Sequence, residues 1–424
     1  MPTQLGRHFW PDFASVLGIR VDFLSPTIYL TDVFVLVIFI LWLFRSLQNL
    51  TLKALKRKDK KIIFKPYFLH FAKSPFLVFI FVFLFLILNV LISGRILGGM
   101  YSLLKFLEIS FVAHYMAQFI YEKNQLRKII SLFSISVIFE SLLAIIQFMK
   151  QGSIGGLLYF LGERTFDGST PGIANASLNG ELVLRPYATF PHPNVLAGYL
   201  LIVMILILFS LESIEELKIK TLKLVTLFLA SIALVLSMSR VAILLWVFVV
   251  VYYFLSQSKR KIALCVLAFI ALFILSPLGV RFRGITAGDE AIVMRSVLID
   301  SSLKMIGKNP FIGIGLGNFI PILSTIQKPL SFGLYLQPVH NIFFLVAAET
   351  GLIGLGFFLW LLFKTFKRIM TYESKTKACL FIIISSILIL GLFDHYWLTL
   401  QQGQLLFGCI IGLCWVVKER KFFS

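Results

Sequence analysis

Long apolar windows without charge constrain the fold of this chain more than any other feature of its sequence. Several windows of roughly 15 to 25 residues contain no charged side chain, and a helix of about 20 apolar residues crosses a hydrocarbon core of roughly 30 Å. Only structures that satisfy their own backbone hydrogen bonds can span lipid. The sequence therefore predicts an all-α fold, a polytopic integral membrane bundle of about 11–12 transmembrane helices.

Eleven segments are candidates for these spans. They lie at residues 27–44, 75–93, 100–121, 129–149, 193–211, 221–238, 240–256, 262–278, 339–363, 378–393 and 403–417. With 58% hydrophobic and 15% aromatic residues, the chain is far more apolar than a soluble protein of average composition.

The net charge of +20 has a one-sided distribution. With His340 placed on the outer face and the spans alternating, 26 of the 40 basic residues fall in inner loops. Cytoplasmic loops of membrane proteins carry this excess of Lys and Arg. We therefore expect a multi-pass protein of the cytoplasmic (inner) membrane, whose basic loops contact membrane lipids, with no nucleic-acid partner.

An odd number of spans, eleven, with the C-terminal tail inside places the N-terminus outside. Residues 1–26 would lie outside, although they contain no apolar run long enough to cross and no cleavable signal-peptide pattern. Three interpretations remain open: an N-terminus outside, an incorrect span elsewhere, or a missing first helix.

Two polar segments interrupt the apolar pattern and fall on the outer face. Both are rich in Gly, Pro, Ser and Asn, and loops held by a rigid scaffold commonly carry function. We therefore predict an N-terminal transmembrane region at 1–150, an outer loop at 151–192, and a core at 193–424 that contains an outer catalytic loop at 279–338.

The first outer loop ends in "LRPYATFPHPNVLAGYL". Pro193 suits the first turn of a helix, which His192 or Asn194 can cap. Alternatively, the free backbone N–H groups of that helix start form an anion site together with Arg185. Both interpretations stay open.

Further cations fall on the same outer face. Arg240 follows "SMS" at the junction of two spans, Arg295 lies in a helical pattern, and His340 opens an apolar segment. An arginine is costly at mid-membrane but reaches water or phosphate at a helix end. Three arginines, including Arg185, and one histidine therefore converge at the outer boundary.

The turn "GIGLG" at Gly313–Gly317 resembles part of a dinucleotide-binding fingerprint. That fingerprint needs a strand and a βαβ unit, which an all-helical chain excludes. What remains is a turn around Gly315 that lets the backbone approach either a phosphate or another backbone segment.

Four motifs in order resemble the O-antigen ligase and polymerase family, membrane glycosyltransferases that share the Wzy C-terminal domain. "RPYATFPHPNVLAGYL" is similar to the family's Arg-x-x-Gly-Thr-Phe-x-x-Pro-Asn-x-x-Ala segment, with Ala188 where glycine is common. "SMSR" and "MRSVLIDSSLKMIGKNPFIGIGLGNF" follow. His340 and Asn341, nine residues and "GLIG" match the ligase pattern.

The resemblance implies a GT-C-like bundle that transfers a glycan at the outer face. The family's donor is a polyprenyl (undecaprenyl) diphosphate-linked glycan, and the acceptor is a hydroxyl of a lipid, glycan or protein. By resemblance, His340 removes the acceptor's proton while Arg240 and Arg295 hold the diphosphate. The expected substrate-binding residues are Arg185, His192, Asn194, Asn341 and Gly315.

No metal ion or other cofactor is expected. Nucleotide-sugar transferases commonly hold Mg²⁺ with closely spaced aspartates, and this chain lacks an Asp-x-Asp motif. The adjacent Asp289 and Glu290 are a candidate for a metal site or a carboxylate base, but we interpret them as a solvated pair.

Several polar residues near or within the spans have a structural interpretation. Glu108, three residues after Lys105, predicts an ion pair. We interpret Glu140 as a hydrogen-bonded link between helices. Glu349 lies about 13 Å along the helix from His340, so we interpret it as a buried structural group.

The stretch "FDHYW", which contains Asp394 and His395, predicts an aromatic anchor at the membrane boundary. The alternative is that one of these two residues lines the acceptor side of the site.

Two alternatives to a ligase remain. A polymerase would use the same chemistry on a second lipid-linked repeat unit. A transporter of a glycolipid or small anion would instead place its essential charges along a path through the bilayer, at Glu108, His114, Glu140 and Glu349.

Overall fold

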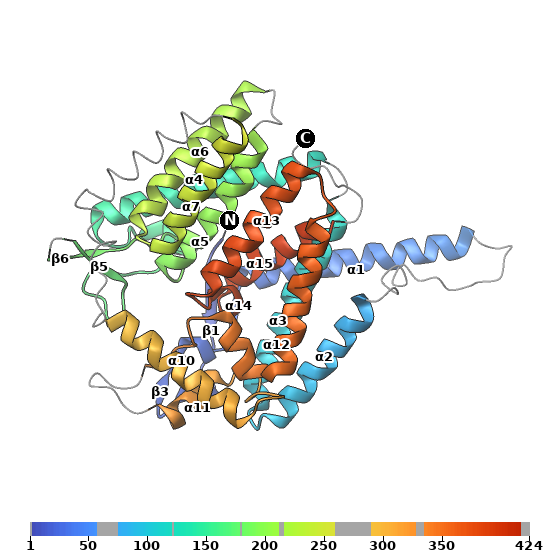
Figure 1. Cartoon of the computed structure of the whole chain (residues 1–424), viewed down its shortest axis with the longest axis vertical. Helices are drawn as coiled ribbons and strands as arrows, with labels where there is room; N and C mark the ends of the chain where they lie inside the picture. The colour runs from blue at the N-terminus through green and yellow to red at the C-terminus, as the bar shows by residue number, and fades with distance from the viewer. Residues whose placement is uncertain are drawn as a thin grey trace.

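The fold is a bundle of long helices that carries small hairpins (Figure 1). The computed structural model describes residues 2–56, 75–120, 123–178, 180–211, 216–258, 290–327 and 335–416. The helices in these ranges are α1 (Leu30–Lys56), α2 (Pro75–Ile92), α3 (Ile96–Phe119), α4 (Lys123–Lys150), α5 (Pro193–Ser210), α6 (Leu217–Leu236), α7 (Arg240–Ser256), α10 (Glu290–Lys308), α11 (Phe319–Ile326), α12 (Ile342–Ile369), α13 (Ser374–Gly391), α14 (Tyr396–Thr399) and α15 (Gln401–Cys414). Short 3-10 helices lie at Asp12–Ala14, Asp22–Leu24 and Gly156–Leu161.

Each hairpin pairs two antiparallel strands. The pairs are β1 (Gly6–His8) with β4 (Thr27–Tyr29), β2 (Ser15–Val16) with β3 (Ile19–Arg20), and β5 (Asn175–Leu178) with β6 (Glu181–Leu184). The sequence did not predict these strands, because two to four residues are too few to show a period of two.

Among the described helices, seven are long and apolar enough to cross a membrane, and they are α1, α3, α4, α5, α6, α12 and α13. α2 and α7 are shorter apolar helices. Ten of the eleven predicted spans fall on helices, and the remaining one, 262–278, lies outside the described residues. The predicted polytopic helical membrane fold is confirmed.

The helices alternate in direction between two ends of the bundle. One end of the bundle carries His340, and α5 and α12 begin there. The helices α4, α6 and α13 end there. Hydrogen bonds between residues next to these helix ends show that the ends lie together. We call this the His340 end. The described basic clusters at 123–128, 218–223 and 364–377 lie at the opposite end, as expected from the charge distribution.

The centre of the bundle is α5, which is apolar on all sides. In its 18-residue span, 94% of residues are buried. α4, α6, α7, α13 and α15 pack around it. A helix enclosed in this way supplies the rigid axis on which the loops at its start are mounted.

The N-terminal segment before α1 packs against the His340 end. Val16 belongs to one apolar cluster with Leu298 of α10 and Phe319 of α11. The ring centroid of Phe23 lies 5.4 Å from that of His395. Of the three interpretations for residues 1–26, the structure supports an N-terminal segment on the same side as His340.

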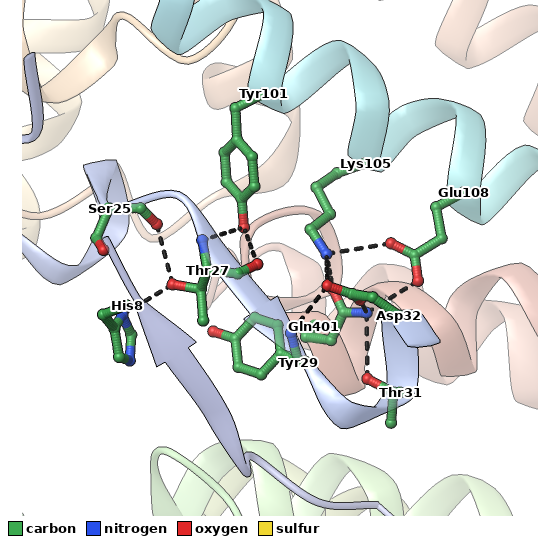
Figure 2. A network of polar contacts seen from close by, with 10 residues as sticks. All are labelled: His8, Ser25, Thr27, Tyr29, Thr31, Asp32, Tyr101, Lys105, Glu108 and Gln401. Carbon is green, nitrogen blue, oxygen red and sulfur yellow. Dashed lines mark hydrogen bonds and ion pairs between the residues drawn. The ribbon is translucent and has the colours of Figure 1, made fainter. Parts of the chain in front are cut away.

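A charged network joins α3 to α1 and α15 (Figure 2). The Lys105 ammonium donates to Asp32 of α1 at 2.7 Å, to Glu108 at 3.1 Å and to the Gln401 amide oxygen of α15 at 2.9 Å. The Gln401 amide nitrogen donates in turn to both carboxylates. The predicted pair of Lys105 and Glu108 is confirmed, and every hydrogen of the ammonium has an acceptor.

We expect Lys105→Met to lower the free energy of unfolding by roughly 2–3 kcal/mol, because Asp32 and Glu108 then face each other without a counter-charge. The loss should stay below that of a fully buried pair, since these side chains keep 11–20% exposure. Unfolding in detergent micelles measures it. As a control, Lys304→Met breaks an ion pair with 56% and 63% exposed partners and should change stability by less than about 0.5 kcal/mol. Equal losses in the two variants would contradict the structural role of Lys105.

Candidate active site

His340 precedes α12, and its neighbour Asn341 holds that helix start in place. The Asn341 side-chain oxygen accepts from the backbone N–H groups of Phe343 at 2.9 Å and Phe344 at 3.1 Å. Its amide nitrogen donates to the carbonyl of Leu392, after α13, at 3.3 Å. These contacts fix the start of α12 beside His340, and substrate binding by Asn341 stays a prediction.

Two residues from the segment after α13 lie against His340. Asp394 Oδ1 is 3.6 Å from His340 Nδ1, a separation too long for a hydrogen bond but short enough for strong electrostatic interaction. The ring centroids of His340 and His395 are 5.0 Å apart. The backbone N–H of His395 donates to Asp394 Oδ1 at 2.8 Å.

This placement corrects the interpretation of "FDHYW" as an aromatic anchor. Tyr396 and Trp397 are each 1% exposed, and Asp394 and His395 are also buried. α14 packs closely on α5, since an added Cβ at Gly198 would lie 2.1 Å from the Tyr396 hydroxyl. The apolar contact that looked like a lipid boundary is made with the protein's own central helix.

A chain of hydrogen bonds links the first outer loop to Asp394. Arg185 Nη2 donates to Asn194 Oδ1 at 2.6 Å, and Asn194 Nδ2 donates to Asp394 Oδ2 at 2.9 Å. Arg185 Nε also donates to the carbonyl of Ser237, between α6 and α7, at 2.8 Å. Three segments far apart in sequence are thereby joined around one carboxylate.

His192 caps the start of α5. Its Nδ1 accepts from the backbone N–H of Asn194 at 3.1 Å, and Pro193 occupies the first turn. The predicted helix-start role of His192 is confirmed. His192 also interacts electrostatically with Asp394 and His340, and Asn194 bonds to Asp394, so both belong to the cluster around Asp394.

Polar groups on α4 hold the loop that carries these residues. Both oxygens of Glu140 accept from Thr189, one from its backbone N–H at 3.1 Å and one from its hydroxyl at 2.8 Å. Gln147, two turns further on, accepts from the N–H groups of Tyr187 at 3.0 Å and Ala188 at 2.7 Å. The prediction that Glu140 is a hydrogen-bonded structural link is confirmed.

The backbone of this loop is unusual at Ala188, where the motif quoted in the sequence analysis has glycine. Ala188 has a φ of 50°, in the left-handed region that side chains disfavour and glycine adopts freely. A glycine would fit this backbone without strain. Two hydrogen bonds hold the strained conformation: the backbone N–H of Ala188 donates to Gln147, and that of Thr189 donates to Glu140.

Burial and neighbouring charge set the protonation of the cluster. Burial, reinforced by the Arg185 charge, lowers the pKa of His192 to about 3. Burial also lowers the pKa of His395 to about 3, against the opposing effect of Asp394. Burial acts to raise the pKa of Asp394, but contact with His340 and the other histidines outweighs it, so this pKa falls below its ordinary range. At neutral pH the cluster holds a carboxylate beside two neutral imidazoles.

The two remaining predicted arginines lie on α7 and α10. Arg240 begins α7, three residues after the Ser237 carbonyl that Arg185 contacts. Within the described part of the chain, its buried Nε has no hydrogen-bond partner. Arg295 is half-buried in α10, which packs against α12.

The glycine-rich turn docks on a break in α12. Gly351 has a φ of 67° and interrupts the helix, leaving the carbonyl of Glu349 free to accept from the backbone N–H of Gly315 at 2.9 Å. A Cβ added at Gly313 would lie 2.5 Å from the Glu349 backbone. The interpretation in which backbone approaches backbone is confirmed.

Gly315 therefore has a packing role, and an added Cβ would lie 2.1 Å from Ser93. Its part in substrate binding stays a prediction. The Glu349 carboxylate accepts from the backbone N–H of Phe319 at 3.3 Å. The prediction that Glu349 is a structural group is confirmed by this bond, although the residue is half-buried and not fully buried. Asp289 lies outside the described residues.

Replacing Glu140 tests whether its carboxylate is structural. We expect Glu140→Leu to destabilise the protein by about 1–3 kcal/mol, because the backbone N–H of Thr189 loses its acceptor while the Thr189 hydroxyl keeps the carbonyl of Pro2 at 2.7 Å. Glu140→Gln should cost less than half as much, since its amide oxygen still accepts from that N–H. Unfolding in detergent measures both. If the two variants unfold like the unaltered protein, this role is wrong.

Comparison with known proteins gives a family match for the segment that includes the start of α12. Residues 225–359 match the model of a protein family described as O-antigen ligase, and the matched segment contains Arg240, Arg295 and His340. A search of curated proteins returned no match. The chain is thus a polytopic helical membrane protein in which residues 225–359 are similar to the O-antigen ligase family.

Proposed function

We propose that the protein is a membrane glycosyltransferase that moves a glycan from a polyprenyl-diphosphate donor to a hydroxyl acceptor. The observation that carries this proposal is the chain of contacts from Arg185 through Asn194 to Asp394, which lies beside His340. A base candidate and cationic residues thereby gather at one end of the bundle. The O-antigen ligase match supports the same chemistry.

His340 is the general base in this proposal. Its side chain keeps 17% exposure, which leaves it open to an acceptor hydroxyl, and Asp394 lies close enough to stabilise the imidazolium that forms. The hydroxyl oxygen bonds to the anomeric carbon as its proton passes to His340. The bond from that carbon to the diphosphate oxygen breaks, and polyprenyl diphosphate leaves with the negative charge.

We assign the leaving diphosphate to Arg240. Its buried, unpartnered Nε can bind a phosphate oxygen without displacing any hydrogen bond described within the protein. Arg185 already donates to two acceptors, so we assign it to positioning Asn194 and Asp394. We assign Arg295 as a second permanent positive charge, which stabilises the negative charge that develops on the leaving diphosphate.

The alternatives differ in their support. A polymerase would use the same residues on a lipid-linked repeat unit, and the length of the product distinguishes it from a ligase. The transporter alternative is weakened because intramembrane carboxylates that it would need are engaged in internal contacts: Glu108 with Lys105, Glu140 with Thr189, and Glu349 with Phe319.

Reconstitution with a polyprenyl-diphosphate glycan in the presence of EDTA tests the proposal. We expect a transferred glycan and released polyprenyl diphosphate. His340→Ala should reduce transfer at least about 100-fold, because general-base catalysis contributes typically 10²–10⁴-fold. His114→Ala, in α3 beside Trp42, is the matched control and should retain transfer. Normal transfer by the folded His340→Ala protein would exclude His340 as the base.

We also propose that the His340 end faces the outside of the cytoplasmic membrane, because the described basic clusters lie at the opposite end. Thr325 and Thr371 are exposed residues at the two ends. In a background without the native cysteines, a membrane-impermeant maleimide should label Thr325→Cys in intact cells and Thr371→Cys only after permeabilisation. The reverse pattern would show the opposite orientation.

A further inference from the structure

The His340 end contains a set of side chains with metal-ligand spacing. His340, Asp394 and His395 each offer one ligand atom, and these three atoms all lie within 4.8 Å of one another. We infer that they form a binding site for a divalent transition-metal ion such as Zn²⁺, and that this ion inhibits glycan transfer by occupying the base. Binding is independent of the proposed function, whereas the inhibition rests on it.

The donor set fits the chemistry of such an ion. Zn²⁺ accepts imidazole nitrogen and carboxylate oxygen at about 2.0–2.2 Å, which puts tetrahedral ligand atoms roughly 3.3–3.5 Å apart. His340 Nδ1 and Asp394 Oδ1 are already 3.6 Å apart. Since the whole set lies within 4.8 Å, contraction of the longest separation by up to about 1.5 Å completes the site.

Hydrogen bonds determine which nitrogen of His395 is available. The Thr399 hydroxyl donates to the carbonyl of His395 at 3.1 Å, so its single hydrogen is used. We therefore assign His395 Nδ1, 2.6 Å from the same hydroxyl oxygen, as the donor of that contact. The lone pair consequently lies on Nε2, and Thr399 holds the ring as outer partners of metal-bound histidines do.

The other two groups are also free to bind. The buried Nδ1 of His340 has no hydrogen-bond partner among the residues that the structure describes. The Asp394 carboxylate is oriented by the Asn194 amide and by the N–H of His395. Asp394 and His395 are buried whereas His340 is partly exposed, so an ion held by all three keeps a coordination position toward solvent.

An ion at this position has a defined consequence for the proposed transfer. When the metal holds Nδ1, the remaining ring proton lies on Nε2, so neither nitrogen of His340 can accept the proton of an acceptor hydroxyl. Transfer itself needs no metal in this scheme, and a chelator should restore it. The site is then a point at which metal concentration regulates activity.

Equilibrium dialysis of the purified, tag-free protein with Zn²⁺ tests the site without any need for activity. We expect one bound equivalent, lost in His340→Ala and in His395→Ala and retained in His114→Ala. Thr399→Val should weaken binding about 10-fold, because it removes the group that orients His395. Co²⁺ absorption provides a second readout, since imidazole coordination changes the visible spectrum. Absence of a bound equivalent, or binding equal in both histidine variants and the unaltered protein, would overturn the inference.

Transfer assays with added Zn²⁺ test the consequence. Inhibition should follow the binding curve and be reversed by EDTA. Bound Zn²⁺ without inhibition, or stimulation by it, would refute the inhibitory role. A protein that binds Zn²⁺ as expected but transfers no glycan under any condition would contradict the proposed function while supporting the site.

Discussion

A chain folded in lipid has to satisfy its buried polar groups from within itself, and this constraint shapes the whole His340 end. Glu140 accepts from Thr189, Gln147 from Ala188, and Glu349 from Phe319. Each of these side chains lies on a helix and bonds to the backbone of a loop or helix start. The interactions that satisfy buried groups therefore also fix the loops from which the site is built.

The site depends on this arrangement because its members come from separate segments. Arg185 and Asn194 precede or begin α5, His340 precedes α12, and Asp394 follows α13. Asp394 is the point where they meet, since Asn194 donates to it and His340 lies beside it. A shift of any of these helix ends would separate the base candidate from the arginine network.

Part of this site could be predicted from the sequence, because its signals are local. His192, Pro193 and Asn194 form a recognisable helix start, and His340 is a polar residue at the boundary of an apolar segment. Asp394 and His395 carried no such signal, since "FDHYW" has the composition of an aromatic anchor. Asn341 and Gly315 were assigned to substrate by their place in motifs, but their contacts are with the protein's own backbone.

The sequence by itself determined that the chain folds in a membrane, that it is helical and on which side its polar groups gather. The length of an apolar segment and the charge of a loop are properties of single segments. Tertiary structure decided which polar residues meet. α14 packs on Gly198 of α5 and turns Asp394 and His395 inward to His340, whereas the break at Gly351 sends Glu349 to the glycine-rich turn. Those outcomes depend on the close approach of segments distant in sequence, which no local pattern encodes.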